Sequence, residues 1–116
     1  MSTNLQFDQI CLPPECQKLR EEVRAFIAGE VAAGTFVPDR PGHGDTQNRE
    51  FSKRVGAKGW IGMTWPKQYG GHERNFLERF VVTEEMRVAN APVRLHFVAD
   101  RQSGPILLTY APEHIK

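Results

Sequence analysis

The sequence lacks a charge excess of either sign. Lys and Arg together number 15 among the 116 residues, and Asp and Glu number 14. Proteins that hold nucleic acid or an anionic membrane surface need a strong positive field. The sequence therefore predicts no nucleic-acid partner and no membrane-surface partner.

Long apolar runs are also missing. No stretch approaches the roughly 20 apolar residues that are needed to cross a bilayer. The first ten residues, MSTNLQFDQI, contain no basic segment ahead of a signal-type apolar run. We therefore expect a cytoplasmic protein without a membrane-spanning segment.

Cysteine and histidine are too few and too scattered for a metal site. Cys11 and Cys16 are the only cysteines, and neither is part of a CxxC pair. No two histidines share the i, i+4 spacing of a helical metal site, and they fall in four segments: His43, His72, His96 and His114. We predict no metal ligand, and we interpret the cysteines as structural thiols because disulfides are rare in reducing compartments.

What the sequence does have is the composition of a folded domain. Hydrophobic residues make up 40% and charged residues 25% of the chain, which is typical of globular rather than disordered proteins. The length suits one domain with one core. We expect a flexible tail over residues 1–14, which ends at a Pro-Pro pair, and a single domain over residues 15–116.

Helical periodicity is clearest just after the tail. From Glu15 the apolar residues recur at spacings of three and four, with charged residues between them, which predicts an amphipathic helix. Its apolar positions are Cys16, Leu19, Val23, Phe26, Ile27 and Val31.

Further helices are predicted between loops rich in Gly and Pro. Asp45 or Thr46 is expected to cap a helix that ends near Lys58, with Gly59 in the left-handed terminating position. The loop TWPKQYGGH precedes a long helix over about residues 74–89. Residues 93–102 are also predicted to be helical, and Gly104-Pro105 to restart a short helix. Since no segment alternates with period two, the fold class is all-α, a bundle of about five helices.

The long helix has apolar residues on two sides. Leu77, Phe80, Val81 and Val88 share one face and Val82 and Met86 lie opposite, which predicts a central position in the core. Glu84 falls within the first face. We expect it to be a buried carboxylate paired with Arg87 or Arg79 rather than a catalytic acid or base.

Two blocks of the sequence resemble the acyl-CoA dehydrogenase family. In the first, GWIGMTWPKQYGGHERNFLERFVVTEEMRV, a glycine-rich loop leads into a helix with paired glutamates. Its matching residues are Gly59, Gly62, Pro66, Tyr69, Gly70, Gly71, Thr83, Glu84 and Glu85. The second block, HFVADRQSGPILLTYAPEHIK, has Asp100, Arg101, Gln102, Gly104 and Pro105 in the family's order. His72 and Glu73 depart from the family pattern, which has a small residue after the glycine pair.

The resemblance implies the N-terminal helical domain of a larger FAD enzyme. Such enzymes dehydrogenate an acyl-CoA thioester between its α and β carbons, and an electron-transfer flavoprotein reoxidises the flavin. The middle and C-terminal domains hold the flavin and the catalytic carboxylate, so no residue of this chain is expected to be catalytic or to bind FAD. Those parts would come from the rest of a longer chain or from a second subunit. The expected truncation agrees with Pro112-Glu113, which is typical of a helical first turn only a few residues before Lys116.

What the resemblance assigns to this domain is one wall of the acyl pocket. The candidates lie on the helix of the second block: Arg94, Leu95, Phe97, Val98 and Arg101. Bundle packing is the alternative for the apolar three, and surface ion pairing for the arginines.

Two interpretations of the whole chain remain open. A part of a dehydrogenase should expose an apolar surface that includes Trp60, Ile61, Phe97 and residues 106–108. A free-standing, non-catalytic helical interaction module should bind a protein partner and no flavin.

Overall fold

The structure, a computed structural model, describes residues 7–38 and 47–116 and contains helices and loops but no strand within those ranges. The all-α prediction is confirmed. The α-helices are α1 (Pro14–Ala32), α2 (Arg49–Ala57), α3 (Phe76–Val88), α4 (Arg94–Val98) and α5 (Gly104–Tyr110), joined by a 3₁₀ turn, η2 (Lys67–Tyr69), and a π-helical segment, η3 (Ala99–Ser103). No helix in the described residues is both long and apolar enough to cross a membrane.

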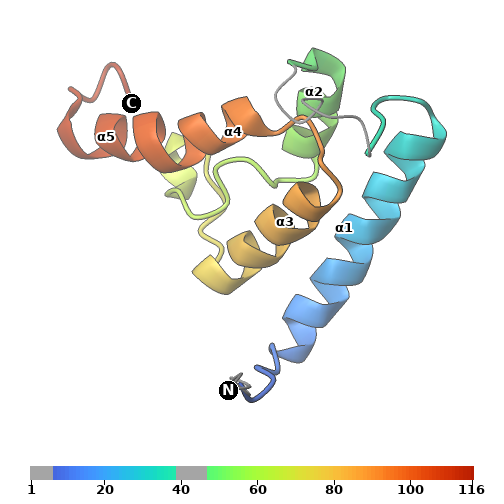
Figure 1. The fold of residues 1–116 in the computed structure, drawn as a ribbon. Coiled ribbons are helices and arrows are strands. Elements are labelled where there is room, and N and C mark those ends of the chain that lie inside the picture. The colour runs from blue at the N-terminus through green and yellow to red at the C-terminus, as the bar shows by residue number, and fades with distance from the viewer. Residues whose placement is uncertain (1–6, 39–46) are drawn as a thin grey trace, which may run out of the picture.

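Helix α1 is the longest element and packs along α3 (Figure 1). It begins with a proline in its first turn, where the missing N–H costs nothing. Its buried side chains include Cys16, Leu19, Val23 and Ile27. This is the apolar face that the periodicity predicts, so the prediction of this helix is confirmed.

Helix α2 is capped by Asn48, whose side chain accepts a hydrogen bond from Phe51 N at 2.9 Å. The predicted cap, Asp45 or Thr46, was wrong because Asn48 holds this position; Asp45 and Thr46 themselves lie outside the described residues. Asn caps helices as well as Asp does, so residue type alone did not distinguish these positions. Gly59 has φ 74° and takes the left-handed position expected of it.

Helix α3 starts one residue after Asn75, which forms a capping box with Glu78. Only one side of α3 is buried, through Val81, Val82, Glu85 and Met86. The predicted central position was wrong, because Leu77, Phe80 and Val88 are 47%, 49% and 80% exposed. Among the described residues, α1 packs against one side of α3, and Leu77, Phe80 and Val88 stay exposed to solvent.

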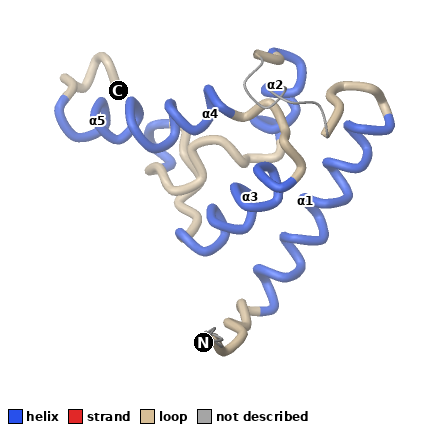
Figure 2. The backbone as a smooth tube through the Cα atoms, viewed as in Figure 1, coloured by secondary structure: helices blue, strands red, loops and turns tan. Residues whose placement is uncertain are grey.

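Helix α4, η3 and α5 follow one another without a break (Figure 2). The sequence predicted a restart at Gly104-Pro105, but the helical run passes through both residues. A proline in a helix removes a hydrogen bond and its ring crowds the carbonyl four residues earlier. The wider π turn just before Pro105 changes the carbonyl pattern there, which lets the run continue. Residues 113–115 form a turn and not the first turn of a helix.

Aromatic side chains join these elements into one core. Phe26 of α1 contacts Phe51 of α2 at a ring-centroid distance of 5.9 Å and Trp60 at 5.2 Å, edge to face. Phe36 packs edge to face on Phe51 at 5.4 Å. Trp60 is only 4% exposed, so its predicted place in an exposed apolar surface was wrong. Of the other residues of that expected surface, Ile106 and Leu107 are exposed, and Ile61, Phe97 and Leu108 are partly buried.

Candidate functional site: a cavity between α3 and α4

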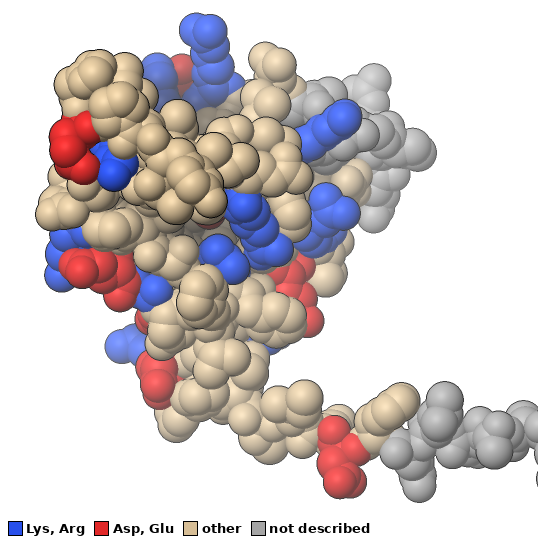
Figure 3. Space-filling model, turned by 90° about the vertical axis from the view of Figure 1, so that its left-hand side faces the viewer, with Lys and Arg blue, Asp and Glu red and all other residues tan. Residues whose placement is uncertain are grey.

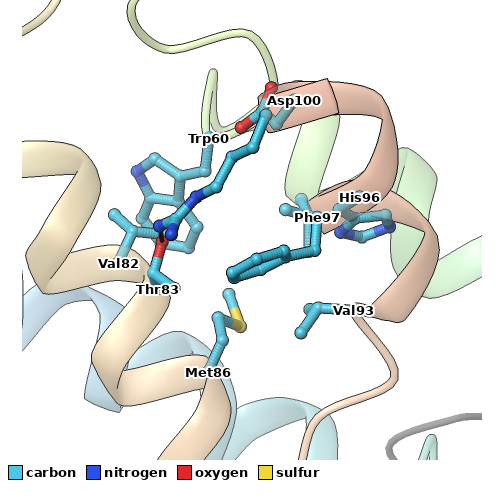
Figure 4. Close-up of a pocket in the computed structure, with 10 residues that line it drawn as sticks. Trp60, Val82, Thr83, Met86, Val93, His96, Phe97 and Asp100 are labelled. Carbon is cyan, nitrogen blue, oxygen red and sulfur yellow. Dashed lines mark hydrogen bonds between the residues drawn. The ribbon is translucent and has the colours of Figure 1, made fainter. Parts of the chain in front are cut away.

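A small cavity lies between α3, η3, α4 and the connector that follows α2 (Figure 4). Its floor is buried and apolar, and its rim is partly exposed and, apart from one phenylalanine, polar. The floor consists of Val55, Trp60, Val82, Met86 and Val93, and the rim of Thr83, His96, Phe97, Asp100 and Arg101. The volume is about 40 Å³, enough for one small group, since a water molecule occupies about 30 Å³ of liquid.

Two hydrogen bonds from the glycine-rich loop hold η3 at the cavity. Gly62 N donates to Asp100 Oδ1 at 2.5 Å, and Trp65 Nε1 donates to the Asp100 carbonyl at 3.3 Å. Gly62 has φ 66°, a conformation that glycine adopts with little strain. The loop motif and the second sequence block therefore meet in space, although about 38 residues separate them.

The loop closes because two glycines allow a close approach to Trp65. A Cβ at Gly71 would overlap the Trp65 carbonyl, and a Cβ at Gly104 would overlap the Trp65 indole ring and the Ala99 carbonyl. Gly70, with φ 82°, terminates η2 in the left-handed conformation. The expected tight turn at Gly70-Gly71 is confirmed. The Trp65 ring packs between the loop and the start of α5.

Arg101 crosses from η3 to α3 at the rim of the cavity. Its Nη2 donates to Thr83 Oγ1 at 2.9 Å, and its guanidinium lies 4.1 Å from the centroid of the Phe97 ring. Burial lowers the pKa of Arg101, the charge of Arg79 lowers it further, and Asp100 raises it in part. The guanidinium stays charged at neutral pH, because arginine is not deprotonated in proteins.

The structure brings together two of the five predicted pocket residues, Phe97 and Arg101, at this cavity. The other three point elsewhere. Leu95 and Val98 are 52% and 41% exposed, and Arg94 is exposed as well. Leu95 lies instead beside the start of α2, next to Asn48 and Ser52. The role of all five residues in an acyl pocket stays a prediction.

Sequence reasoning missed His96 as a member of the site. Its Nε2 lies 2.6 Å from Ser52 Oγ, and its ring stacks on Phe51 with a centroid distance of 6.4 Å. These contacts tie α4 to α2. Thr83 and Met86 were also missed, because their facing partners lie on a helix that is distant in sequence. The only local signal was the i, i+4 spacing of Phe97 and Arg101, which places both on one side of the run.

An ionic cluster joins α1 to α3 next to the buried apolar residues of α3. The Glu85 carboxylate accepts hydrogen bonds from Arg20, and from Arg24 Nε at 2.8 Å. Glu84 Oε2 lies 2.6 Å from Arg20 Nη1. Burial by itself raises the pKa of Glu85, but the hydrogen bonds from Arg24 and Arg20 outweigh it and hold the pKa below its ordinary value.

The prediction for Glu84 was therefore wrong in two respects. The buried carboxylate is Glu85, with a side chain 8% exposed, whereas Glu84 is 40% exposed. The partner is Arg20 of α1 rather than Arg87 or Arg79. One residue on a helix turns the side chain by about 100°, and the side that α1 covers is the side of Glu85.

Stability is expected to fall in two steps as the pH is lowered. Burial lowers the pKa of His96 below its ordinary value of 6.5, although Asp100 opposes this. The folded state therefore binds fewer protons than the unfolded state. The stability that His96 contributes is present above its ordinary pKa and is lost as the pH falls through its lowered pKa in the folded state. The lowered pKa values of Glu30, Glu78 and Glu85 add a second loss below their ordinary value of 4.5.

Thermal unfolding followed by circular dichroism at several pH values between about 8 and about 4 checks this. His96→Gln keeps a side chain that can bond to Ser52 but does not titrate. It should remove the first loss and leave the second unchanged. If the first loss of stability persists in His96→Gln, a group other than His96 causes it.

The fold and the cavity define a class of protein. This is an all-helical domain in which a glycine-rich loop supports a helical wall, with a cavity too small to enclose a whole organic ligand. Sites for such ligands usually occupy about 300–1,000 Å³. The domain therefore has the form of one side of a larger site.

Comparison with known proteins identifies the family. Residues 13–116 match the family described as acyl-CoA dehydrogenase, N-terminal domain. Because this match spans most of the chain, the chain belongs to the acyl-CoA dehydrogenase family and carries its N-terminal domain.

Individual relatives agree with this assignment. Acyl-CoA dehydrogenase FadE26 of Mycobacterium tuberculosis is 29% identical over 93% of this chain, which covers 28% of that protein. The mitochondrial isovaleryl-CoA dehydrogenase of Pongo abelii is 36% identical over 76% of this chain and 21% of that protein. The solved structure of the ChsE4-ChsE5 complex from M. tuberculosis matches with a TM-score of 0.70 and 28% identity, over 92% of this chain and 26% of that one. This chain thus spans less than a third of each relative's length.

Proposed function

We propose that this chain acts as the N-terminal domain of an FAD-dependent acyl-CoA dehydrogenase and supplies one wall of its acyl pocket. The reaction is the α,β-dehydrogenation of an acyl-CoA thioester. The single observation that carries the proposal is the family match over residues 13–116, which includes the helical run that borders the cavity. On this proposal the chain contains no catalytic residue.

The composition of the surface supports a domain that is covered by further protein. Helices α3, α4 and α5 expose many large apolar side chains, among them Leu77, Phe80, Val88, Leu95, Val98, Ile106, Leu107 and Tyr110. Figure 3 shows the side of the molecule that carries α5, where basic and acidic side chains are interspersed around broad areas without charge. Apolar residues spread over three neighbouring helices are typical of a surface that meets another domain or subunit.

The cavity does not suit a flavin. A dinucleotide needs a site of several hundred Å³, whereas the cavity between α3 and α4 measures about 40 Å³. FAD would therefore be held by parts of the enzyme outside this chain, as the resemblance implies. What the residues of this chain would do is bind and orient the acyl group and exclude water from it, with Phe97 as the apolar contact and Trp60 and Met86 beneath it.

Assembly with other acyl-CoA dehydrogenase chains is part of the proposal. The matched solved structure is a complex of two proteins, ChsE4 and ChsE5. A domain that spans about a quarter of such a chain would be completed by middle and C-terminal domains, either on the same polypeptide or on a second subunit. The electron-transfer flavoprotein would be the electron acceptor of the complete enzyme.

The test is an acyl-CoA screen of the native protein purified from its source. Anaerobic addition of a suitable acyl-CoA should bleach the visible absorption of bound flavin. Phe97→Ala should shift the preference toward longer or bulkier acyl groups by about tenfold in kcat/KM, since one methylene in an apolar pocket changes specificity by roughly 10–200-fold.

Val37→Ala is the matched control, because Val37 is 52% exposed and precedes α2. It should leave the acyl preference unchanged. A native protein that contains no flavin and bleaches with no acyl-CoA would overturn the proposal and favour the non-catalytic interaction module.

A further inference from the structure

The outer side of α3, opposite its buried side, carries large apolar side chains. Four of them are exposed: Phe76, Leu77, Phe80 and Val88. A helix at the surface of a domain normally turns charged and polar residues toward solvent. This side of α3 instead has the composition of a surface that another protein element covers.

Two arginines lie on the same side of α3. Successive residues of a helix are turned by about 100°, so Arg79 and Arg87 lie within about 80° of each other. They are eight residues apart, which is about 12 Å along the helix axis. The Arg79 guanidinium lies 4.8 Å from the centroid of the Phe76 ring. The Arg87 guanidinium lies 6.0 Å from the centroid of the Phe97 ring.

No acid compensates these two charges within the part of the chain that the structure describes. The acidic side chains of α3 form ion pairs with other arginines: Glu78 with Arg74, and Glu84 and Glu85 with Arg20. Burial and the charge of Arg79 lower the pKa of Arg101, and Asp100 offsets this in part. Arg79 therefore lies close enough to a second cation to repel it. The outer side of α3 is apolar and positively charged.

This composition favours a protein partner over a nucleic acid or an anionic membrane. Arginine and aromatic residues are enriched in protein interfaces, and lysine is depleted. Helix α3 contains no lysine. Nucleic acids and anionic membranes are bound through a strong positive field, whereas the whole chain has a net charge of +1. A carboxylate is the protein group that matches a guanidinium, through two parallel N–H···O bonds.

We propose that the outer side of α3 binds an acidic amphipathic helix of the domain or subunit that covers this domain. That helix carries two carboxylates seven or eight residues apart, one for Arg79 and one for Arg87, because this spacing gives about the same separation along its own axis. Its apolar residues pack on Phe80 between the two ion pairs. The proposal rests on the proposed function, in which further protein covers this domain, and it adds the chemistry of the covering element.

The test introduces Arg79→Lys or Arg87→Lys into the native protein, expressed in its source and purified with whatever assembles on it. Lysine keeps the positive charge, and a water-soluble carbodiimide joins its amine to a carboxylate that is in contact with it. Mass spectrometry should find cross-links from both positions to Asp or Glu residues outside residues 1–116. The two acidic residues should lie seven or eight positions apart in one segment.

Acetylation by an amine reagent measures whether the two positions are covered. Each variant should react at least about tenfold more slowly at its substituted position in the native protein than after unfolding in urea, since a close charge pair at an interface contributes this much or more. Arg49→Lys is the matched control, because Arg49 is exposed at the start of α2. It should react in the native protein nearly as fast as after unfolding.

Acetylation of positions 79 and 87 at the rate of the unfolded protein would overturn the proposal, because the outer side of α3 would then be open to solvent. Protection without a cross-link to a carboxylate would also overturn it, because an element without acidic groups would then cover α3. Protection that is lost on treatment with nuclease or detergent would assign the surface to a nucleic acid or a membrane instead.

The absorption of bound flavin is recorded on the same samples. A native protein that bleaches with an acyl-CoA but forms no cross-link from either position would refute this proposal alone and leave the proposed function intact. A native protein without flavin would refute the proposed function, whatever the cross-links show.

Discussion

Glu85→Gln is expected to lower the free energy of unfolding of this chain by about 2–3 kcal/mol. The carboxylate is 8% exposed and accepts hydrogen bonds from both Arg20 and Arg24. Gln keeps the shape but removes the charge and places an amide N–H₂ against two guanidinium groups. Breaking a fully buried pair costs roughly 3–5 kcal/mol, and the expected loss is smaller here because Arg24 is 64% exposed.

Urea unfolding of the variant and of the parent chain measures this loss. Glu84→Gln is the matched control on the next residue, since Glu84 also contacts Arg20 but is 40% exposed. Its effect should stay below about 1 kcal/mol, as for other exposed ion pairs. Equal effects of the two substitutions would contradict the assignment of Glu85 as the buried member of the cluster.

Gly104→Ala and Gly29→Ala should change stability in opposite directions, although both glycines are helical. A Cβ at Gly104 would overlap the Trp65 ring and the Ala99 carbonyl, and nothing lies within 4 Å of a Cβ at Gly29. Overpacking of this kind costs about 1–3 kcal/mol, occasionally more, and we expect about 3 kcal/mol for Gly104→Ala. Gly29→Ala should stabilise the chain by about 0.5–1 kcal/mol because alanine is the better helix former.

The same unfolding experiment, with tryptophan fluorescence as a second probe, checks both values. Gly104→Ala should also alter the emission of the native state, because Trp65 packs directly on the added methyl group. A neutral Gly104→Ala would show that α5 and the loop move apart without cost. In that case the loop would not hold η3 at the cavity.

Features that depend on neighbours in the chain were predictable. The apolar face of α1, the left-handed Gly59 and the turn at Gly70-Gly71 follow from spacing and from the backbone freedom of glycine. The family resemblance rested on the same loop. Of the candidate site, Phe97 and Arg101 were found through that resemblance, but the contact between Arg101 and Thr83 was not.

The features that escaped prediction depend on which side of a helix another element covers. Helix α3 offers two apolar faces, and its sequence contains nothing that decides between Glu84 and Glu85 as the buried carboxylate. The choice is made by α1, whose Arg20 and Arg24 lie opposite Glu85. In the same way, Phe80 and Val88 are as apolar as Val81, yet they are exposed because no described residue packs over them.

The amino-acid sequence alone established that this chain is helical, where its main loops turn and to which family it belongs. These properties arise from periodicity, caps and glycine positions within a few residues of one another. The tertiary structure alone decided that His96 joins α2 to α4 and that Arg101 lies over an apolar cavity. Those outcomes require residues from helices that are distant in sequence to meet, and the energy of such contacts is set by the partner that each side chain finds.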